Sequence, residues 1–400
     1  MSEAIENKAP SFFRGIKGDK VIWAVVILLS IMSILAVYSS TGTLAYKQRD
    51  GNTEYFLIKH GGILLFGLFL MYVAHLIKYT YYSRIAQILL LITYPLLILT
   101  LFMGTNLNEA SRWLTLPGTS MTFQTSDLAK LALIMYIARL LAKKQDEIKD
   151  FKSAFLPIML PVLIICALIL PGNLSTCMMV MATALILMFI GRMNMKYLLG
   201  FVGAGLAMVT IFIMIALNSP NKGRAGTWMN RIDNFFKPNS KDNYQVEQAK
   251  IAIATGGIIG KLPGNSTQRN FLPHPYSDFI FAIILEEYGL LGGFVILMLY
   301  LILLYRAAHI ATKCDRIFPA LLVTGCALML VFQALVNMAV AVNLMPVTGQ
   351  PLPLISMGGT SLWFTSISIG IILSVSRSTE DEESEEKTQE IKNEPEHGIA

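Results

Sequence analysis

The sequence predicts an all-α integral membrane protein with about ten transmembrane helices and a large outward loop between helices 7 and 8. Of its 400 residues, 54% are hydrophobic and only 14% are charged, whereas about a quarter of the residues in a soluble domain are charged. The mean hydropathy is +0.57. A helix needs about 20 apolar residues to cross a bilayer, and the chain contains about ten such runs.

The predicted spans follow one another along most of the chain. They lie near residues 21–41, 56–77, 84–103, 126–142, 154–171, 174–191, 196–217, 278–305, 317–343 and 360–376. Residues 1–20 are polar and predict a cytoplasmic segment, and the first apolar run has full span length without a small-residue cleavage site. This pattern indicates a retained helix rather than a signal peptide. After the membrane domain of residues 21–377, the acidic residues 378–400 predict a disordered cytoplasmic tail.

The basic residues predict the topology. They fill alternate short loops, which should be cytoplasmic because of the positive-inside bias. With ten spans, both termini are then cytoplasmic, and the loops near 42–55, 104–125, 218–277 and 344–359 face outward. The net charge of +6 is scattered and does not indicate nucleic-acid binding. The cysteines lack metal-type spacing, which predicts buried free thiols; they are Cys166, Cys177, Cys314 and Cys326.

The outward loop near 104–125 leads into a helix that begins with Ser126 and Asp127. A hydroxyl cap and an early acid both complement the free amides of a helix start. Lys130 follows one turn later, and two interpretations stay open. It pairs with Asp127 at i, i+3, or it lines an outward polar cavity together with Arg112.

The second span begins near Lys59 and His60, which we expect at the outer interface, where a long lysine side chain reaches the headgroups. The outward loop 218–277 is too long to be structureless in a compact domain. Its stretch 244–254 is amphipathic, with Ile251, Ala254 and Ile258 at helical spacing and a glycine pair that ends the helix. These features predict an ordered cap over the outer face.

Acidic residues lie at and inside the predicted eighth span. Asp278 stands where a Pro-containing polar segment meets a long apolar run, and Glu286 and Glu287 follow about two turns deeper, in the expected hydrocarbon. A charge within a membrane helix costs about 2.5 to 3.5 kcal/mol on insertion scales, so it indicates a functional site. We expect the two glutamates to form interhelical hydrogen bonds or ion pairs. The Pro/Gly-rich segment 344–359 predicts irregular backbone that lines a cavity or is buried in protein.

These residues together resemble the SEDS family of polytopic membrane proteins, represented by FtsW in division and RodA in elongation, over residues 19–377. The motifs are an Arg-Trp pair at 112–113, Gln-x-Ser-acid-x-x-Lys at 124–130, Tyr-Gln-x-x-Gln-Ala at 244–249, Gly-Gly-x-x-Gly at 256–260, Leu-Pro and Ser-Asp-Phe-Ile-Phe at 272–281, Glu-Glu-x-Gly at 286–289, and Pro-Val-Thr-Gly-x-Pro-Leu-Pro at 346–353. Two departures are notable. Asn173 stands where the family often has Asp, and His274 replaces a frequent Glu.

The resemblance implies a peptidoglycan glycosyltransferase that polymerises lipid II in the bacterial inner membrane, with its active site on the outer face. It also implies a class B penicillin-binding protein as transpeptidase partner, other divisome proteins, and a divalent cation, Mg or Mn, whose ligands the sequence does not identify. Short tails and compact length favour the division type, at the septum, over the elongation type. The competing hypotheses are a transporter that flips lipid II and a structural scaffold.

The expected chemistry assigns roles to the motif residues. Asp278 matches the family's catalytic Asp and is the predicted general base, because a carboxylate at the membrane boundary can accept a hydroxyl proton. Substrate-binding residues at motif positions are Arg112, Lys130, Arg231, Lys250, Gln248, Ser277 and Ser356. Supporting residues are Glu286, Glu287, His274, Pro346, Thr348, Gly349 and Pro353.

Overall fold

The computed structural model describes residues 17–49, 51–107, 110–115, 122–218, 235 and 244–393. Each predicted span corresponds to a helix. These helices are α1 (Lys20–Ser40), α3 (Thr53–Leu76), α4 (Tyr79–Met103), α5 (Thr125–Lys143), α6 (Leu156–Ile169, preceded by the π-helical turn Phe151–Phe155), α7 (Leu174–Ile190), α8 (Met195–Asn218), α11 (Ile280–Thr312), α12 (Ile317–Ala341) and α13 (Gly359–Asn393). Within the described residues, seven helices are long and apolar enough to cross a membrane, and α7 and α8 contain shorter apolar segments.

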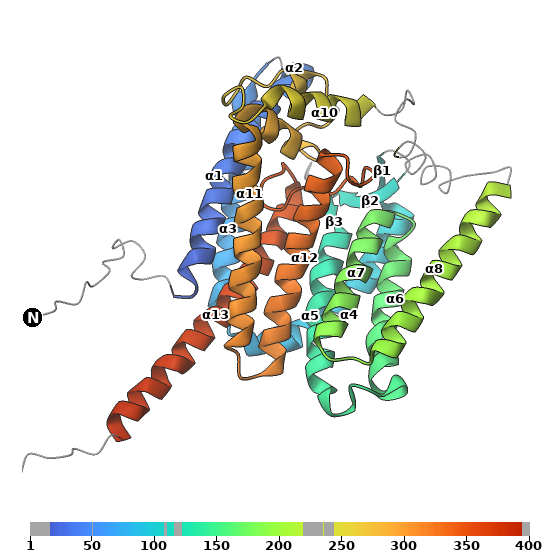
Figure 1. Cartoon of the computed structure of the whole chain (residues 1–400), viewed down its shortest axis with the longest axis vertical. Coiled ribbons are helices and arrows are strands. Elements are labelled where there is room, and N and C mark those ends of the chain that lie inside the picture. The colour runs from blue at the N-terminus through green and yellow to red at the C-terminus, as the bar shows by residue number, and fades with distance from the viewer. Residues whose placement is uncertain are drawn as a thin grey trace, which may run out of the picture.

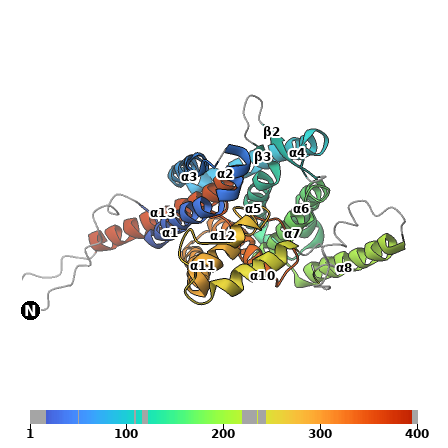
Figure 2. The ribbon, with the colours of Figure 1, turned by 90° about the horizontal axis from the view of Figure 1, so that it is seen from above.

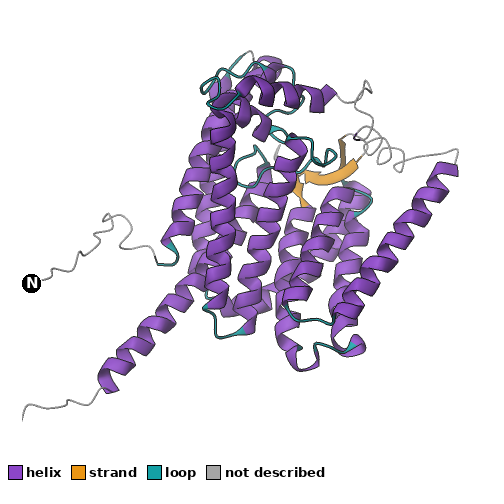
Figure 3. Ribbon diagram, in the orientation of Figure 1, coloured by secondary structure: helices purple, strands orange, loops and turns teal. Residues whose placement is uncertain are grey.

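The helices form one bundle with a decorated end, which is uppermost in Figure 1 and is called the cap end below. It carries α2 (Gly42–Arg49), the predicted amphipathic helix α10 (Tyr244–Gly256) and a three-stranded antiparallel sheet of order β1-β2-β3. Strands β1 (Thr105–Leu107), β2 (Ala110–Thr115) and β3 (Thr122–Gln124) appear in orange in Figure 3. The prediction of an all-α fold therefore holds for the membrane domain, and the 104–125 loop adds a small sheet.

Helix α8 leans away from the other helices, as Figures 1 and 2 show. Aromatic contacts join the start of α8 to the start of α6 at the end opposite the cap. Phe151 packs edge-on against Tyr197 with ring centroids 5.1 Å apart, and Phe155 contacts both Tyr197 and Phe201. The described attachment of α8 therefore lies at one end of this helix.

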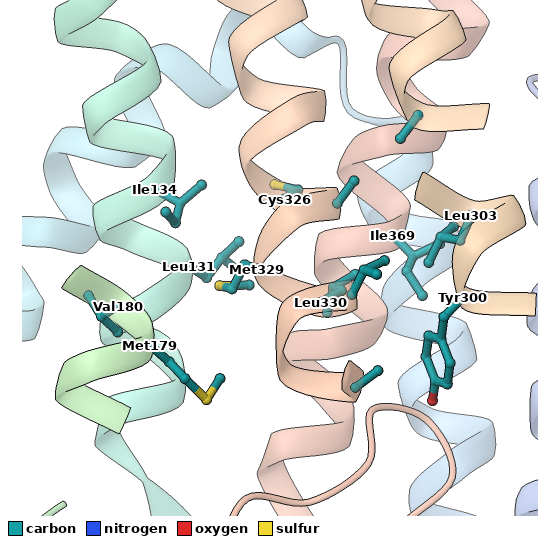
Figure 4. Close-up of a cluster of buried hydrophobic side chains, with 14 of the residues drawn as sticks. Leu131, Ile134, Met179, Val180, Tyr300, Leu303, Cys326, Met329, Leu330 and Ile369 are labelled. Carbon is teal, nitrogen blue, oxygen red and sulfur yellow. The ribbon is translucent and has the colours of Figure 1, made fainter. Parts of the chain in front are cut away.

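The bundle centre is apolar and closely packed. Figure 4 shows Leu131 and Ile134 from α5 beside Met179 and Val180 from α7 and Met329 from α12. All four cysteines are free, as predicted; two are buried and two are half-buried.

Small residues bring α3 and α13 close together. A Cβ atom added at Gly67 would lie 2.6 Å from a side-chain carbon of Leu362, and one added at Gly370 would lie 2.4 Å from the carbonyl oxygen of Met71. Membrane helices commonly use small residues at such contacts, because dispersion forces and not hydrophobic burial hold them together in lipid. Glycine is thus required at 370 by backbone proximity.

Helix α11 is broken near its start, which differs from the continuous span expected at 278–305. Gly289 has φ 67° and ψ −169°, a conformation that favours glycine, and it separates a short first part from the longer second part. The turn after α10 covers this break: the N–H of Leu290 donates to Gly257 O at 3.0 Å, and the N–H of Leu291 donates to Ile258 O at 3.2 Å. The break therefore lies at the cap end.

The cap helix α10 turns a different face inward from the one the apolar spacing suggested. Its buried residues are Ala249, Ala252 and Gly256, while Ile251 and Ile258 are exposed. A Cβ at Gly256 would lie 2.1 Å from Leu285 O. Small side chains are buried because the backbone of α10 approaches the backbone of α11 directly.

The prediction of a disordered tail from residue 378 is wrong for residues 378–393, where α13 continues and projects from the bundle in Figure 1. Tertiary contacts hold the first residues of this extension in place. The N–H of Gly18 donates to Glu380 at 3.0 Å, and Lys17 pairs with Asp381 at 2.9 Å. Glutamate, lysine and glutamine are good helix formers, so a helix fixed at its start extends through this sequence.

Candidate active site

Asp278 lies in the irregular segment 271–279, immediately before α11, which begins at Ile280. Its side chain is half-buried, and the hydroxyl of Ser277 donates to its Oδ1 at 3.0 Å. The amide Nδ2 of Asn337 donates to the backbone carbonyl of Asp278 at 2.9 Å. Both the carboxylate and the backbone of this residue are therefore oriented by neighbours, and the negative charge stands at a helix start, where it is favourable.

The loop of residues 342–358 between α12 and α13 contains no helix, as its Pro and Gly content predicts. Irregular backbone at membrane depth needs other partners for its carbonyl groups. Four of them accept hydrogen bonds from side chains of three helices: Gln350 from Asn337 at 2.7 Å, Pro351 from Gln333 at 2.9 Å, Pro353 from Tyr300, and Ile355 from Ser33 at 2.9 Å. In Figure 4, the hydroxyl of Tyr300 points away from Leu303 and Ile369. Helices α1, α11 and α12 thus fix the loop.

The fixed loop in turn holds the segment that carries Asp278. The hydroxyl of Ser356 accepts from the N–H of Leu352 and donates to Ser277 O, both at 2.7 Å. The N–H of Met357 donates to Tyr276 O at 2.9 Å. Ser356 is buried, so the structure places it behind Asp278, where it aligns the backbone.

Lys130 forms the predicted i, i+3 ion pair with Asp127, at 2.7 Å, and both side chains are at most 5% exposed. Its ammonium also donates to Gln333 Oε1 at 3.0 Å, and Gln333 donates to Pro351 O. Lys130 therefore reaches the loop through Gln333. Helix α5 begins with Gln124 as its N-cap in place of Ser126, and the Gln124 amide donates to the Ser126 hydroxyl at 3.0 Å.

Of the other candidate substrate-binding residues, the structure describes the side chains of two on α10. Lys250 is exposed and Gln248 half-buried on α10 at the cap end. Arg112 lies in β2, but its side chain is outside the described part of the structure. Arg231 also lies outside the described residues.

Glu286 and Glu287 lie in the short first part of α11, on the cap side of the break at Gly289. The carboxylate of Glu286 pairs with Lys261 at 2.7 Å and accepts hydrogen bonds from the hydroxyls of Ser266 and Thr267 and from the N–H groups of Thr267 and Gln268. Glu287 accepts from the Ser39 hydroxyl of α1 and from the Ser266 N–H. The predicted polar bonding is present, and it anchors the cap segment 261–268 to α1 and α11.

A family model described as "Cell cycle protein", FTSW_RODA_SPOVE, matches residues 19–381. The chain belongs to the FtsW/RodA/SpoVE family. Two relatives illustrate the similarity. The "Probable peptidoglycan glycosyltransferase FtsW" of Geobacter sp. (strain M18) is 33% identical over 366 residues, 90% of this chain and 96% of the relative. "Stage V sporulation protein E" of Bacillus subtilis (strain 168) is 30% identical over 370 residues, 90% and 97% respectively.

Solved structures of the FtsW/RodA/SpoVE family share the fold. The Thermus thermophilus rod shape determining protein RodA superimposes with a TM-score of 0.65 at 26% identity, covering 92% of this chain and 99% of that one. A chain from the structure described as "Structural coordination of polymerization and crosslinking by a peptidoglycan synthase complex" gives 0.72 at 26% identity, covering 90% and 98%. The membrane domain predicted from the apolar runs is therefore the FtsW/RodA/SpoVE fold.

Two positions where this chain departs from the usual family motifs have clear local roles. Asn173 accepts a hydrogen bond from the Thr176 N–H at 3.2 Å as the N-cap of α7, a role that Asn and Asp fill equally well. His274 is exposed, has a left-handed φ of 54°, and lies 3.1 Å from the Tyr276 hydroxyl through Nδ1. Burial, and to a lesser degree the Asp278 carboxylate, raises the pKa of Tyr276, which therefore stays a neutral hydroxyl beside His274.

Among the described residues, no group of three or more His, Cys, Asp or Glu side chains is arranged to hold a metal ion. Mg²⁺ usually keeps several waters and binds through one or two carboxylates plus phosphate oxygens. Asp278 can supply one such carboxylate.

The remaining motif residues belong to the 342–358 loop. Pro346, Thr348 and Gly349 are half-buried, Pro353 is buried, and Gly349 has a φ of 65° that suits glycine. The sequence analysis missed Gln333, Tyr300 and Ser33, which bond the loop from neighbouring helices. One signal was available for Gln333: together with Asn337 it places two amides at i, i+4 within an otherwise apolar helix.

Proposed function

We propose that this chain is a division-type peptidoglycan glycosyltransferase that polymerises lipid II, with Asp278 as general base. The observation that carries the proposal is the half-buried Asp278 carboxylate, held at the cap end by Ser277, Asn337 and the side-chain-bonded 342–358 loop. Such rigid support suits a catalytic group, because catalysis depends on orientation. The names of the relatives, among them peptidoglycan glycosyltransferase FtsW, support this activity.

In the proposed reaction, a sugar hydroxyl attacks the anomeric carbon of a lipid-linked donor. A carbon–oxygen bond forms between the two sugars, and the bond from that carbon to the diphosphate breaks. Asp278 accepts the hydroxyl proton, and the leaving diphosphate takes the electron pair of the broken bond. General-base catalysis by a positioned carboxylate contributes about 10²- to 10⁴-fold.

The leaving diphosphate needs cations. We assign this role to exposed Lys250 and, by their motif positions alone, to Arg112 and Arg231; Gln248 lies on α10 with Lys250. Lys130 acts differently in this scheme, since Asp127 neutralises its charge and Gln333 transmits its position to the loop. A divalent cation, Mg or Mn, would supply additional charge neutralisation, with Asp278 as its carboxylate ligand.

We further propose that the cap end faces outward across the bacterial inner membrane, with both termini cytoplasmic and the protein at the division septum. The alternating basic loops support this orientation. A class B penicillin-binding protein would supply crosslinking, with other divisome proteins attached. The structural similarity to a chain of a peptidoglycan synthase complex that coordinates polymerization and crosslinking supports such a partner.

A lipid II transporter is the competing function. Transport was favoured by acidic residues expected within the membrane, but Glu286 and Glu287 are bonded to the cap segment 261–268. Asp278 also lies at the cap end and not at the middle of a span. The arrangement therefore supports chemistry at one membrane face.

The test is polymerisation of fluorescently labelled lipid II by the purified chain, with and without a co-purified transpeptidase. Asp278→Asn is compared with Asp146→Asn, which removes an exposed carboxylate in the turn Gln145–Glu147 at the opposite end. Polymer from the wild type and Asp146→Asn, but not from Asp278→Asn, is expected. Equal polymer from Asp278→Asn would exclude Asp278 as the base, and no polymer from any sample would favour transport.

A further inference from the structure

His60 does not lie at an interface, as the sequence suggested; it is fully buried in α3. Its Nε2 lies 2.8 Å from the hydroxyl oxygen of Ser33 in α1. The same Ser33 hydroxyl lies 2.9 Å from the backbone carbonyl of Ile355. A polar link thus runs from α3 through α1 to the 342–358 loop.

The direction of the hydrogen bonds in this link follows from proton counting. The Ile355 carbonyl can only accept, so the single hydroxyl proton of Ser33 is donated to it. The Ser33 oxygen must then accept a proton from His60, which places the imidazole proton on Nε2. Nδ1 is buried and has no hydrogen-bond partner among the described side-chain and backbone groups.

Burying a histidine at this position costs more free energy than burying an apolar side chain. An unpaired buried nitrogen is unfavourable, whereas an apolar side chain would leave no such atom. The Nε2–H group is thus the feature of His60 that the fold uses. It orients the Ser33 hydroxyl toward Ile355.

Ile355 directly precedes the two residues that bond the Asp278 segment. Ser356 donates to Ser277 O at 2.7 Å, and the N–H of Met357 donates to Tyr276 O at 2.9 Å. A shift of Ile355 therefore moves both anchors together. The link from His60 therefore leads to the residue next to Ser356, which is bonded to the carbonyl of Ser277, the residue before the proposed base.

We propose that His60 and Ser33 are positioning residues for the polymerisation reaction, holding the Ile355 carbonyl so that Ser356 and Met357 align Asp278. This inference rests on the proposed function. Neither side chain touches the reacting atoms. Loss of the link releases the loop at Ile355, and a displacement of about 1 Å at a catalytic group costs up to roughly 100-fold in rate.

The test measures kcat and KM for labelled lipid II with purified chain and transpeptidase. His60→Leu removes the Nε2–H donor, whereas His60→Gln keeps a donor at a similar reach. We expect His60→Leu to lower kcat roughly tenfold to 100-fold with KM nearly unchanged, and His60→Gln to recover most of the loss. Equal kcat for His60→Leu and wild type would overturn the inference.

A second variant covers the case in which His60→Leu fails to fold. Ser33→Ala breaks the same link with a smaller change and should lower kcat similarly. Its matched control is Ser30→Ala, one turn earlier on α1, because the Ser30 hydroxyl is buried without a partner among the described groups. Equal activity of Ser33→Ala and Ser30→Ala would refute the positioning role.

The double variant Ser33→Ala/His60→Leu should be no worse than either single one, because each change already interrupts the link. Additive losses in kcat would instead mean that the two residues act separately, which contradicts the inference. Failure of the proposed function is distinguishable from all these outcomes, since the wild type would then form no polymer.

Discussion

Gly260 lies in the turn after α10, where the cap meets the break in α11. It has a left-handed φ of 89°, and a Cβ added there would lie 2.2 Å from the Glu287 carbonyl oxygen. Gly264, four residues later, has a similar φ of 84°, but a Cβ there would meet nothing within 4 Å. An alanine at either position is strained by the left-handed φ, but only an alanine at 260 also collides with a neighbouring backbone. Comparing the two substitutions therefore separates the backbone strain from the steric collision. We predict that Gly260→Ala destabilises the cap much more than Gly264→Ala.

The expected difference can be worked from these distances. Both substitutions place an alanine in a left-handed backbone conformation, which costs about 1 to 2 kcal/mol of conformational free energy in each case. Only Gly260→Ala must also push two backbones apart by close to 1 Å, because Cβ contacts below 3.0 Å are essentially never observed. Overpacking of this kind typically costs about 1 to 3 kcal/mol. The free energy of opening the cap should thus fall by about 2 to 5 kcal/mol in Gly260→Ala and by about 1 to 2 in Gly264→Ala.

Hydrogen exchange in detergent measures this opening at the amides of Thr267 and Gln268, which donate to Glu286. Exchange there should accelerate by a further factor of about 5 to 150 in Gly260→Ala relative to Gly264→Ala, from the added 1 to 3 kcal/mol. Amides of α12 serve as the internal control and should not change. Equal acceleration in both variants would refute the argument that backbone proximity requires glycine at 260.

Three further predictions concern other contacts. Glu286→Ala should destabilise the cap by about 3 kcal/mol, because it leaves Lys261 and two N–H groups without their carboxylate partner. Limited proteolysis after residue 261 measures this destabilisation, and an unchanged cleavage rate would contradict the prediction. Gln333→Leu should lower the melting temperature and polymerisation together, since the buried Lys130 ammonium and the Pro351 carbonyl each lose a partner; loss of activity at an unchanged melting temperature would contradict this structural role. Gly370→Ala should separate α3 from α13, because its Cβ would lie 2.4 Å from Met71 O. The free energy of unfolding should fall by about 1 to 3 kcal/mol, as a thermal denaturation measurement would show. The control is Gly203→Ala, where the added atom meets nothing within 4 Å and no such fall is expected.

The sequence by itself determined the transmembrane organisation. Every predicted span corresponds to a helix, because the length of an apolar run is a local property that a bilayer tests directly. It also determined that Asp278 stands at the start of a helix and that the segment predicted at 344–359 is irregular, which the structure shows for residues 342–358. Proline, glycine and the change from polar to apolar composition act within a few residues, so no tertiary information was needed.

Only the tertiary structure decided which polar groups meet. Their position within the predicted span led us to expect Glu286 and Glu287 in hydrocarbon. In the structure they lie before the break at Gly289 and are bonded to residues 261–268. The acidic residues after 377 lack apolar content, yet α13 continues through them, and Glu380 and Asp381 contact residues 17–18.

The partners of the 342–358 loop were equally hidden. Ser33 lies more than 300 residues before Ile355 in the chain, and the two meet only because α1 packs beside the loop. The sequence suggested an interfacial position for His60, because local composition cannot show that the buried Ser33 hydroxyl lies beside it. Spans depend on local hydrophobicity, whereas hydrogen bonds among buried side chains depend on how whole helices pack. The position of Asp278 could therefore be predicted from the sequence, and the groups that hold it could not.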